Sequence, residues 1–199
     1  MPRRLFAFLT TLLAAFAIAG HPARADDPKN DALMLVAQPK LVDAVYNRTV
    51  LIVKPLPNGG HAGFIINKPT EAHLGEVFPD HAPSKKVVDP LYLGGPESLN
   101  TVFALVERQK AVDPSEVPFS PGVYLAVKGT DVDHVIESEA DHARFLVGLV
   151  IWKPGELDAE MDKGFWYQME ADPKVFMRKD TTHLWEELMQ KGEDRKHST

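Results

Sequence analysis

The chain has 199 residues, among them 28 acidic and 22 basic side chains, with a formal net charge of −6 and no cysteine. This length is enough for one domain with its own hydrophobic core. The acidic charge disfavours binding to nucleic acid, whose phosphates are usually met by a basic surface. Without cysteine, the chain has no disulfides, no thiol chemistry and no thiolate zinc site.

Residues 1–25 have the order of a secretory signal. Arg3 and Arg4 precede an apolar run over residues 5–19, and Ala23-Arg24-Ala25 matches a small-residue cleavage site. The run is shorter than the roughly 20 apolar residues that span a bilayer. We therefore expect cleavage after Ala25, no membrane span in the mature chain, and a periplasmic or secreted protein.

The first half of the mature chain is predicted to consist mainly of strands. Pro57–Gly60 is a turn that joins two of them into a hairpin. Pro69 is expected to end a strand, and Thr70 to cap a short helix through Phe78. Residues 79–90 contain three prolines and are predicted to form a loop. The strands are predicted from apolar and β-branched runs at residues 33–37, 49–53 and 62–67.

The rest of the chain mixes strands and helices. Gly164 and Gly192 are expected to end two of the helices. Residues 112–121 are predicted to be a loop and 193–199 a disordered tail, which leaves residues 26–192 as a single domain. The irregular alternation of strands and helices favours an α+β fold. Strands are predicted at residues 91–93, 102–106, 122–127, 144–152 and 165–170, and helices from Thr130 or Asp131, from Gly155, and from Thr181 or Thr182.

The first of three motifs, Gly63-Phe-Ile-Ile-Asn-Lys-Pro69, ends a predicted strand with two polar side chains. Asn67 can bond to nearby backbone, and Lys68 is held extended by the proline that follows it. The simpler interpretation, which we favour, makes Asn67 a bracket at a corner of the chain. The alternative places Asn67 and Lys68 at the mouth of a binding pocket.

The second motif is Leu93-Gly-Gly-Pro96. A turn is the favoured interpretation, because glycine permits tight backbone geometry and proline often follows it. In the alternative, the backbone amides of Gly94 and Gly95 bind an anion.

The third motif is Trp152-Lys-Pro-Gly-Glu-Leu-Asp-Ala-Glu160. Glu156 and Glu160 lie four residues apart and share one helix face. A capped and solvated helix is the favoured interpretation, because acidic side chains are stabilised in the first turn. The alternative is a pair of carboxylates for acid–base catalysis. Trp152 is either a core aromatic or the wall of a pocket.

No pattern for a metal or a cofactor is present. The eight histidines show no H-E-x-x-H spacing, and the chain lacks a P-loop, a dinucleotide-binding glycine motif and a nucleophile elbow. We therefore predict no metal site, no cofactor and no catalytic residue.

In this order and spacing, the three motifs resemble the YqgE/AlgH family of bacterial proteins. The resemblance covers residues 33–191 and includes Leu-Val-Ala-x-Pro at 35–39 and the later tryptophan Trp166. It implies an α+β fold in which a mixed sheet forms a pseudo-barrel with flanking helices. Family members are often labelled transcriptional regulators, but no reaction or ligand is established for the family, so no catalytic residue can be transferred.

The chain also departs from the family pattern. The family is mostly cytoplasmic, whereas the signal predicts export, which speaks against an inherited role in gene regulation. Several polar residues of the family pattern are also replaced by apolar or acidic ones in this chain. The replacements lie at Asp43-Ala44, Leu56, Leu149-Val150-Ile151 and Glu156-Leu157-Asp158.

These observations favour an exported, non-enzymatic domain that binds a small molecule or an envelope protein. One alternative is the transcriptional regulator that the family label suggests. The other is a hydrolase-like enzyme that uses Glu156 and Glu160 with Lys68. The predicted binding residues are Asn67, Lys68, Gly94, Gly95, Trp152, Glu156 and Glu160.

Overall fold

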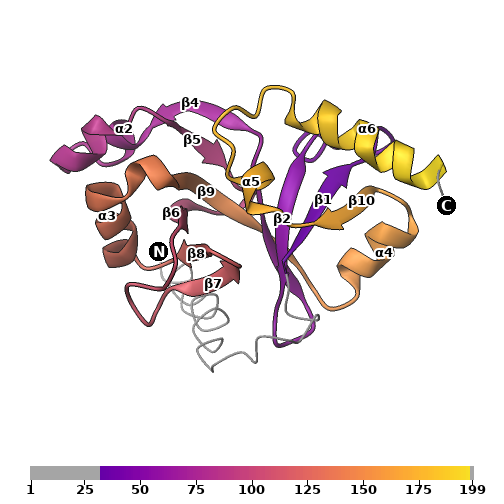
Figure 1. The fold of residues 1–199 in the computed structure, drawn as a ribbon, viewed down its shortest axis with the longest axis horizontal. Helices are drawn as coiled ribbons and strands as arrows, with labels where there is room; N and C mark the ends of the chain where they lie inside the picture. Colours follow the sequence, from indigo (N-terminus) through magenta and orange to yellow (C-terminus); the bar gives the residue numbers. More distant parts are fainter. Residues whose placement is uncertain (1–31, 198–199) are drawn as a thin grey trace, which may run out of the picture.

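The computed structural model describes residues 32–197, so the predicted signal at residues 1–25 lies outside the described residues. Within this range, a curled, mostly antiparallel sheet of ten strands forms a half-barrel with short helices around it (Figure 1). One strand pair is parallel, which makes the sheet mixed. The predicted α+β fold, a mixed sheet in a pseudo-barrel with flanking helices, is confirmed.

One half of the sheet is made by five strands: β1 (Leu33–Ala37), β2 (Val50–Pro55), β3 (His61–Ile65), β9 (Ala143–Trp152) and β10 (Trp166–Glu170). They are antiparallel in the order β10-β1-β2-β3-β9, and β2 and β3 form the predicted hairpin. Both faces of β1, β2, β3 and β9 are largely buried, which suits their β-branched and aromatic side chains, whereas the edge strand β10 exposes Gln168 and Glu170. Ile52 and Phe64 belong to one core, and Leu51 and Ile65 belong to the other.

The other half of the sheet is made by β4 (Pro69–His73), β5 (Pro90–Leu93), β6 (Glu97–Glu107), β7 (Val117–Ser120) and β8 (Val123–Ala126). Strand β9 joins the two halves, because it pairs with β3 and β6 in the antiparallel sense and with β5 in the parallel sense. The strands predicted at 91–93 and 102–106 are therefore confirmed, but each pairs with β9 and not with the other.

Two strands lie where the sequence predicts a helix start and a loop. Strand β4 begins at Pro69, and Thr70 caps no helix, since its Oγ1 donates to the carbonyl of Leu91 at 2.7 Å. Strand β7 lies inside the predicted loop 112–121, and its Pro118 stands at the edge of the sheet. Proline lacks an N–H group, so it fits the first residue of a strand or an edge strand, where no ladder bond is lost.

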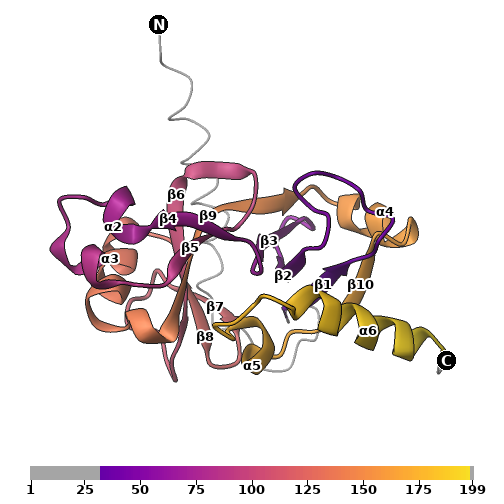
Figure 2. The same cartoon turned by 90° about the horizontal axis from the view of Figure 1, so that it is seen from above.

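Helices cover the outside of the half-barrel (Figure 1). Helix α6 lies across β1 and β10 (Figure 2). No helix within residues 32–197 is long and apolar enough to cross a membrane. The helical segments are α2 (Leu74–Val77), η2 (Ala82–Lys86), α3 (Gly129–Ser138), η3 (Ala140–His142), α4 (Glu156–Asp162), α5 (Pro173–Phe176) and α6 (Leu184–His197).

The limits of two helices differ from the prediction. Helix α3 begins at Gly129, ahead of both predicted caps, Thr130 and Asp131. Helix α6 does not end at Gly192 but continues to the end of the described chain. A Cβ atom at residue 192 would lie 2.7 Å from the ring of Tyr167. The glycine therefore lets the aromatic ring pack against the helix, and it does not serve as a turn.

Candidate functional site

Asn67, at the end of the first motif, holds the connection between β1 and β2. Its Oδ1 accepts a hydrogen bond from the amide of Val50 at 2.7 Å, and its Nδ2 donates to the carbonyl of Arg48 at 3.0 Å. Residues 38–49 form this connection and are called the 38–49 loop below. The contacts agree with the interpretation of Asn67 as a bracket.

Lys68 binds the same loop. Its half-buried ammonium group donates to the carbonyl of Val45 at 2.7 Å. Burial lowers the pKa of Lys68, and the nearby charge of Asp43 opposes this shift. The ammonium group is thus used to fix the loop backbone.

The third motif forms a cluster of two tryptophans around one carboxylate. Glu160 Oε2 accepts hydrogen bonds from Nε1 of Trp152 at 3.0 Å and from Nε1 of Trp166 at 2.8 Å. Both indoles are only 4% exposed, so their N–H groups need a partner inside the protein. Glu160 thereby ties helix α4 to strands β9 and β10.

The tryptophan cluster also holds the 38–49 loop. The ring of Tyr46 meets that of Trp166 edge-on, with centroids 6.3 Å apart and an interplanar angle of 83°. Gln38 Nε2 donates to the carbonyl of Trp166 at 3.2 Å. Burial is the main cause that raises the pKa of Tyr46 to about 12, and the negative charge of Glu160 is the second. The first motif and Trp166, whose indole is bound by Glu160 of the third motif, therefore both fix this loop.

This raised pKa predicts a loss of stability in alkali. The ordinary pKa of tyrosine is 10.0, so the unfolded chain loses this proton before the folded chain does. The Tyr46 contribution to the free energy of unfolding is complete below pH 10.0 and is lost as the pH rises toward about 12. We expect the free energy of unfolding of Tyr46→Phe, measured by urea unfolding, to fall less steeply than that of the wild type over the same pH range. If the free energy of unfolding fell equally steeply with pH in both proteins, the raised pKa of Tyr46 would be contradicted.

The remaining motif residues make backbone contacts. Glu156 Oε2 accepts from the amide of Lys153 at 2.8 Å and closes the turn before α4. The amide of Gly94 donates to the carbonyl of Val147 at 2.8 Å, so the sheet uses this group. A Cβ atom on Gly94 or Gly95 would lie 2.3 Å from the backbone of β9. The two glycines therefore let the chain pass directly against this strand.

The 38–49 loop and Trp185 of helix α6 border an open pocket of about 370 Å³. This volume lies within the range of roughly 300–1,000 Å³ that is typical of small-molecule sites. Trp185 forms one wall, and its Nε1 donates to the carbonyl of Ala37 at 2.8 Å. Val42, which also lines the pocket, is 83% exposed. The lining residues are Gln38, Pro39, Leu41, Val42, Asn47, Arg48 and Trp185.

The sequence prediction did not include Arg48 or Trp185 in a site. Neither residue belongs to one of the three motifs. The length of the 38–49 loop was the available signal, since it far exceeds the roughly 4–6 residues of a typical connection. Long ordered loops of this kind are often functional.

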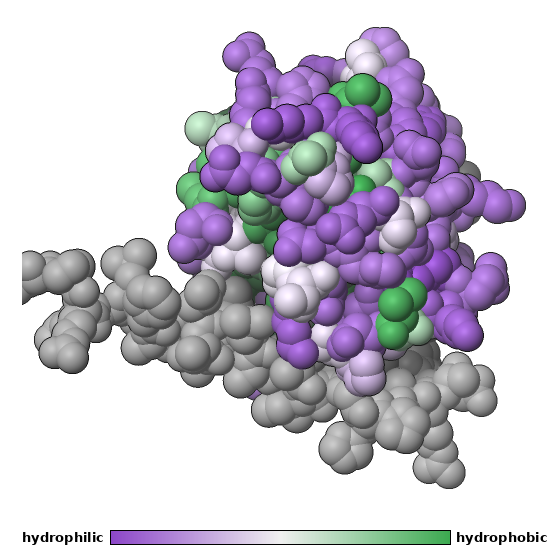
Figure 3. Space-filling view, turned by 90° about the vertical axis from the view of Figure 1, so that its left-hand side faces the viewer, coloured by the Kyte–Doolittle hydropathy of each residue, from purple (hydrophilic) through white to green (hydrophobic). Residues whose placement is uncertain are grey.

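A second groove of about 570 Å³ lies between residues 83–89 and the end of α3. Its walls carry charges of both signs, including Lys86, Asp89, Glu137 and Lys179, and none of the motif residues line it. The end of the molecule that carries α2 and α3 is mainly hydrophilic, with hydrophobic side chains in small separate groups (Figure 3). Among the described residues, no three His, Cys, Asp or Glu side chains are placed to hold a metal ion.

The curled sheet and the loop that its motifs fix define an AlgH-like protein. A family model described as AlgH-like matches residues 34–195, and the chain belongs to this family. A UPF0301 protein of Chlorobium luteolum is 30% identical over 155 residues, which cover 76% of this chain and 80% of that protein. A UPF0301 protein of Bacteroides thetaiotaomicron is 27% identical over 168 residues, which cover 79% of this chain and 80% of that protein.

Two solved structures share the fold. Protein DIP2367 of Corynebacterium diphtheriae superposes with a TM-score of 0.66 and 20% identity, covering 83% of this chain and 88% of that one. The AlgH protein of Pseudomonas aeruginosa superposes with a TM-score of 0.62 and 23% identity, covering 79% and 84%. No activity is established for this family.

Proposed function

We propose that this chain is an exported, non-enzymatic binding domain of the cell envelope that holds a small molecule or a protein partner in the pocket of the 38–49 loop. One observation carries the proposal: Asn67, Lys68 and Trp166 all contact this loop, and Glu160 holds Trp166 in turn. A surface loop that is fixed from two sides is preorganised, which lowers the entropy cost of binding.

The contacts of the acidic residues support a binding role over catalysis. Glu156 accepts from backbone, Glu160 accepts from two indoles, and Lys68 donates to a carbonyl. A general acid or base has to reach the proton that it transfers. The hydrolase hypothesis would require these three side chains to leave their present partners.

Export is tested by cell fractionation and N-terminal sequencing of the mature protein. The proposal expects a chain that begins at Asp26 in the periplasm or the medium. An intact chain in the cytoplasm would remove export and reopen the regulator hypothesis, which salt-sensitive DNA binding would then support.

Binding is tested by an NMR fragment screen on residues 26–199, followed through backbone amides and indole N–H signals. We expect shift changes to gather at Trp185 and in the 38–49 loop. Changes that gather at residues 86–89 instead would move the site to the second groove. Turnover of any substrate that Asn67→Ala abolishes would overturn the non-enzymatic assignment.

A further inference from the structure

The pocket lining combines four apolar side chains, the amides of Gln38 and Asn47, and one cation. Among the described lining residues, Arg48 carries the only charge, and its side chain is 61% exposed. Pro39, Leu41, Val42 and Trp185 supply apolar surface around it. A lining of this kind matches a ligand that has an apolar body and one negative group.

Arg48 is held in a backbone conformation that arginine rarely adopts. Its φ is 53°, in the left-handed region, which costs a residue with a Cβ atom about 1–2 kcal/mol. The Nδ2 atom of Asn67 binds the carbonyl of this residue and helps to hold it there. Backbone strain of this type persists at ligand clamps, where it holds a side chain in position for binding.

The guanidinium group of Arg48 already binds a carboxylate on this surface. It lies 4.5 Å above the ring of Trp185 and forms an ion pair with Glu186. Because the Glu186 side chain is 42% exposed, the pair is weakly stabilising and open to exchange. A stacked guanidinium keeps its planar edge free to meet a carboxylate in bidentate geometry.

We propose that the pocket takes an apolar carboxylate, whose negative group displaces Glu186 from Arg48 while its apolar part packs against Trp185, Leu41 and Val42. This inference rests on the proposed function, since it names the ligand class of the same pocket. Glu186 then acts as an internal competitor, and the two residues of the ion pair affect affinity in opposite directions.

The test compares octanoate with octan-1-ol, which has the same chain and no charge, in NMR titrations of the mature protein. We expect octanoate to shift the Trp185 indole signal and to bind at least about tenfold more tightly than the alcohol, as one charged hydrogen-bonded contact implies. Arg48→Gln should weaken octanoate binding by about tenfold or more. Glu186→Gln should tighten it about two- to fivefold.

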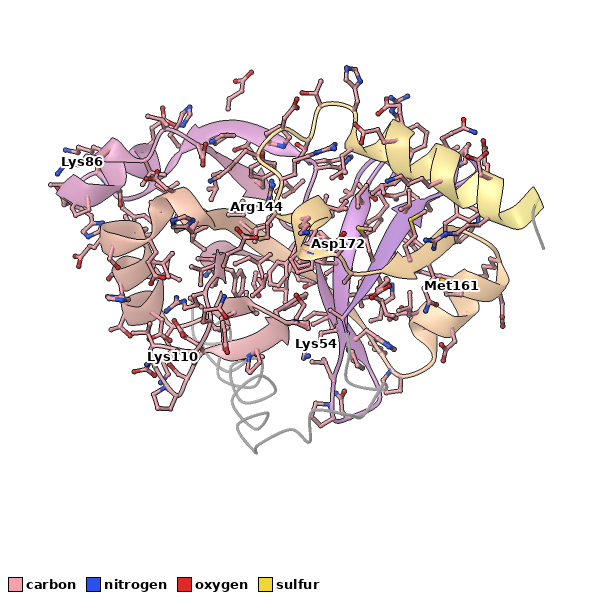
Figure 4. All side chains as sticks on the ribbon, viewed as in Figure 1. Lys54, Lys86, Lys110, Arg144, Met161 and Asp172 are labelled. Atoms are coloured by element: carbon pink, nitrogen blue, oxygen red, sulfur yellow. The ribbon has the colours of Figure 1, made fainter. Side chains whose placement is uncertain are left out.

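Two further variants serve as controls. Lys110→Gln removes one positive charge at the far end of the molecule from α6 and should leave the affinity unchanged (Figure 4). Arg48→Gly removes the guanidinium where glycine suits the backbone, so it should stay folded and lose the preference for the carboxylate.

The outcomes separate the two proposals. Equal binding of octanoate and octan-1-ol at Trp185, with no gain in Glu186→Gln, would overturn the carboxylate assignment and leave the pocket as a binding site. No shift at Trp185 or in the 38–49 loop with either compound or with the fragment screen would overturn the binding site as well.

Discussion

Replacing Gly95 with alanine is expected to lower the free energy of unfolding by about 3 kcal/mol or more. The added Cβ atom would lie 2.3 Å from the carbonyl carbon and oxygen of Leu149 in β9. Backbone at the centre of a sheet cannot move aside as a flexible side chain can, so the central strand would have to shift. Urea unfolding measures the loss directly.

Gly129→Ala is the matched control for this substitution. Nothing lies within 4 Å of a Cβ atom at Gly129, and its φ is not positive. We expect this variant to be as stable as the wild type, or more stable by up to about 1 kcal/mol, because alanine restricts the unfolded chain. Similar losses for both variants would show that close backbone packing is not what Gly95 provides.

Replacing Arg144 with leucine is expected to cost about 3 kcal/mol. Arg144 is only 4% exposed, and its guanidinium lies 4.2 Å above the ring of Tyr92. Nη1 donates to the carbonyl of Ile66 at 3.0 Å, and Nη2 donates to that of Arg178. The side chain thus connects β9 to the segment between α5 and α6 (Figure 4). Leucine would fill part of the space but leave both carbonyls without their donor.

Arg178→Leu is the more exposed counterpart of this substitution, since the Arg178 side chain is 36% exposed. Arg178 pairs with Glu187 on the surface, where ion pairs contribute about 1 kcal/mol or less. Thermal unfolding of both variants should therefore show a clearly larger loss for Arg144→Leu. Burial lowers the pKa of Arg144, which means that the fold already bears a cost for this cation. A small loss in Arg144→Leu would indicate that this cost cancels the value of its hydrogen bonds.

The parts of the fold that the sequence predicted depend on local chemistry. The hairpin of β2 and β3 follows from a turn between two apolar runs. The end of α4 follows from Gly164, whose φ of 64° lies in the left-handed region that glycine favours. Each of these features is decided by neighbours within a few residues.

The parts that were wrong depend on distant neighbours. Pro69 begins a strand only because β5 lies beside it, and Gly192 lies inside α6 at the position where the ring of Tyr167 leaves no room for a Cβ atom. The parallel pairing of β5 with β9 joins Tyr92 to Leu146, and no local pattern indicates such a partner.

The sequence predicted individual residues of the candidate site but not how they come together in space. Asn67 and Lys68 were named from the sequence, as was Glu160, which acts through Trp166, but their target was not. That target, the 38–49 loop, carries Arg48 and forms the pocket with Trp185, which lies more than a hundred residues further along the chain. Side chains that act through another segment can be recognised only when that segment is placed in space.

The central position of β9 has a consequence for how the protein is made. Strands β3, β5 and β6 all leave the ribosome before their shared partner, which is complete only at Trp152. At translation rates of about 5–20 residues per second, the edge of β3 waits on the order of ten seconds. Unpaired strand edges attract other chains during such a delay. A nascent chain that stops short of Trp152 therefore cannot close its sheet, and it keeps the edge of β3 unpaired until β9 is complete.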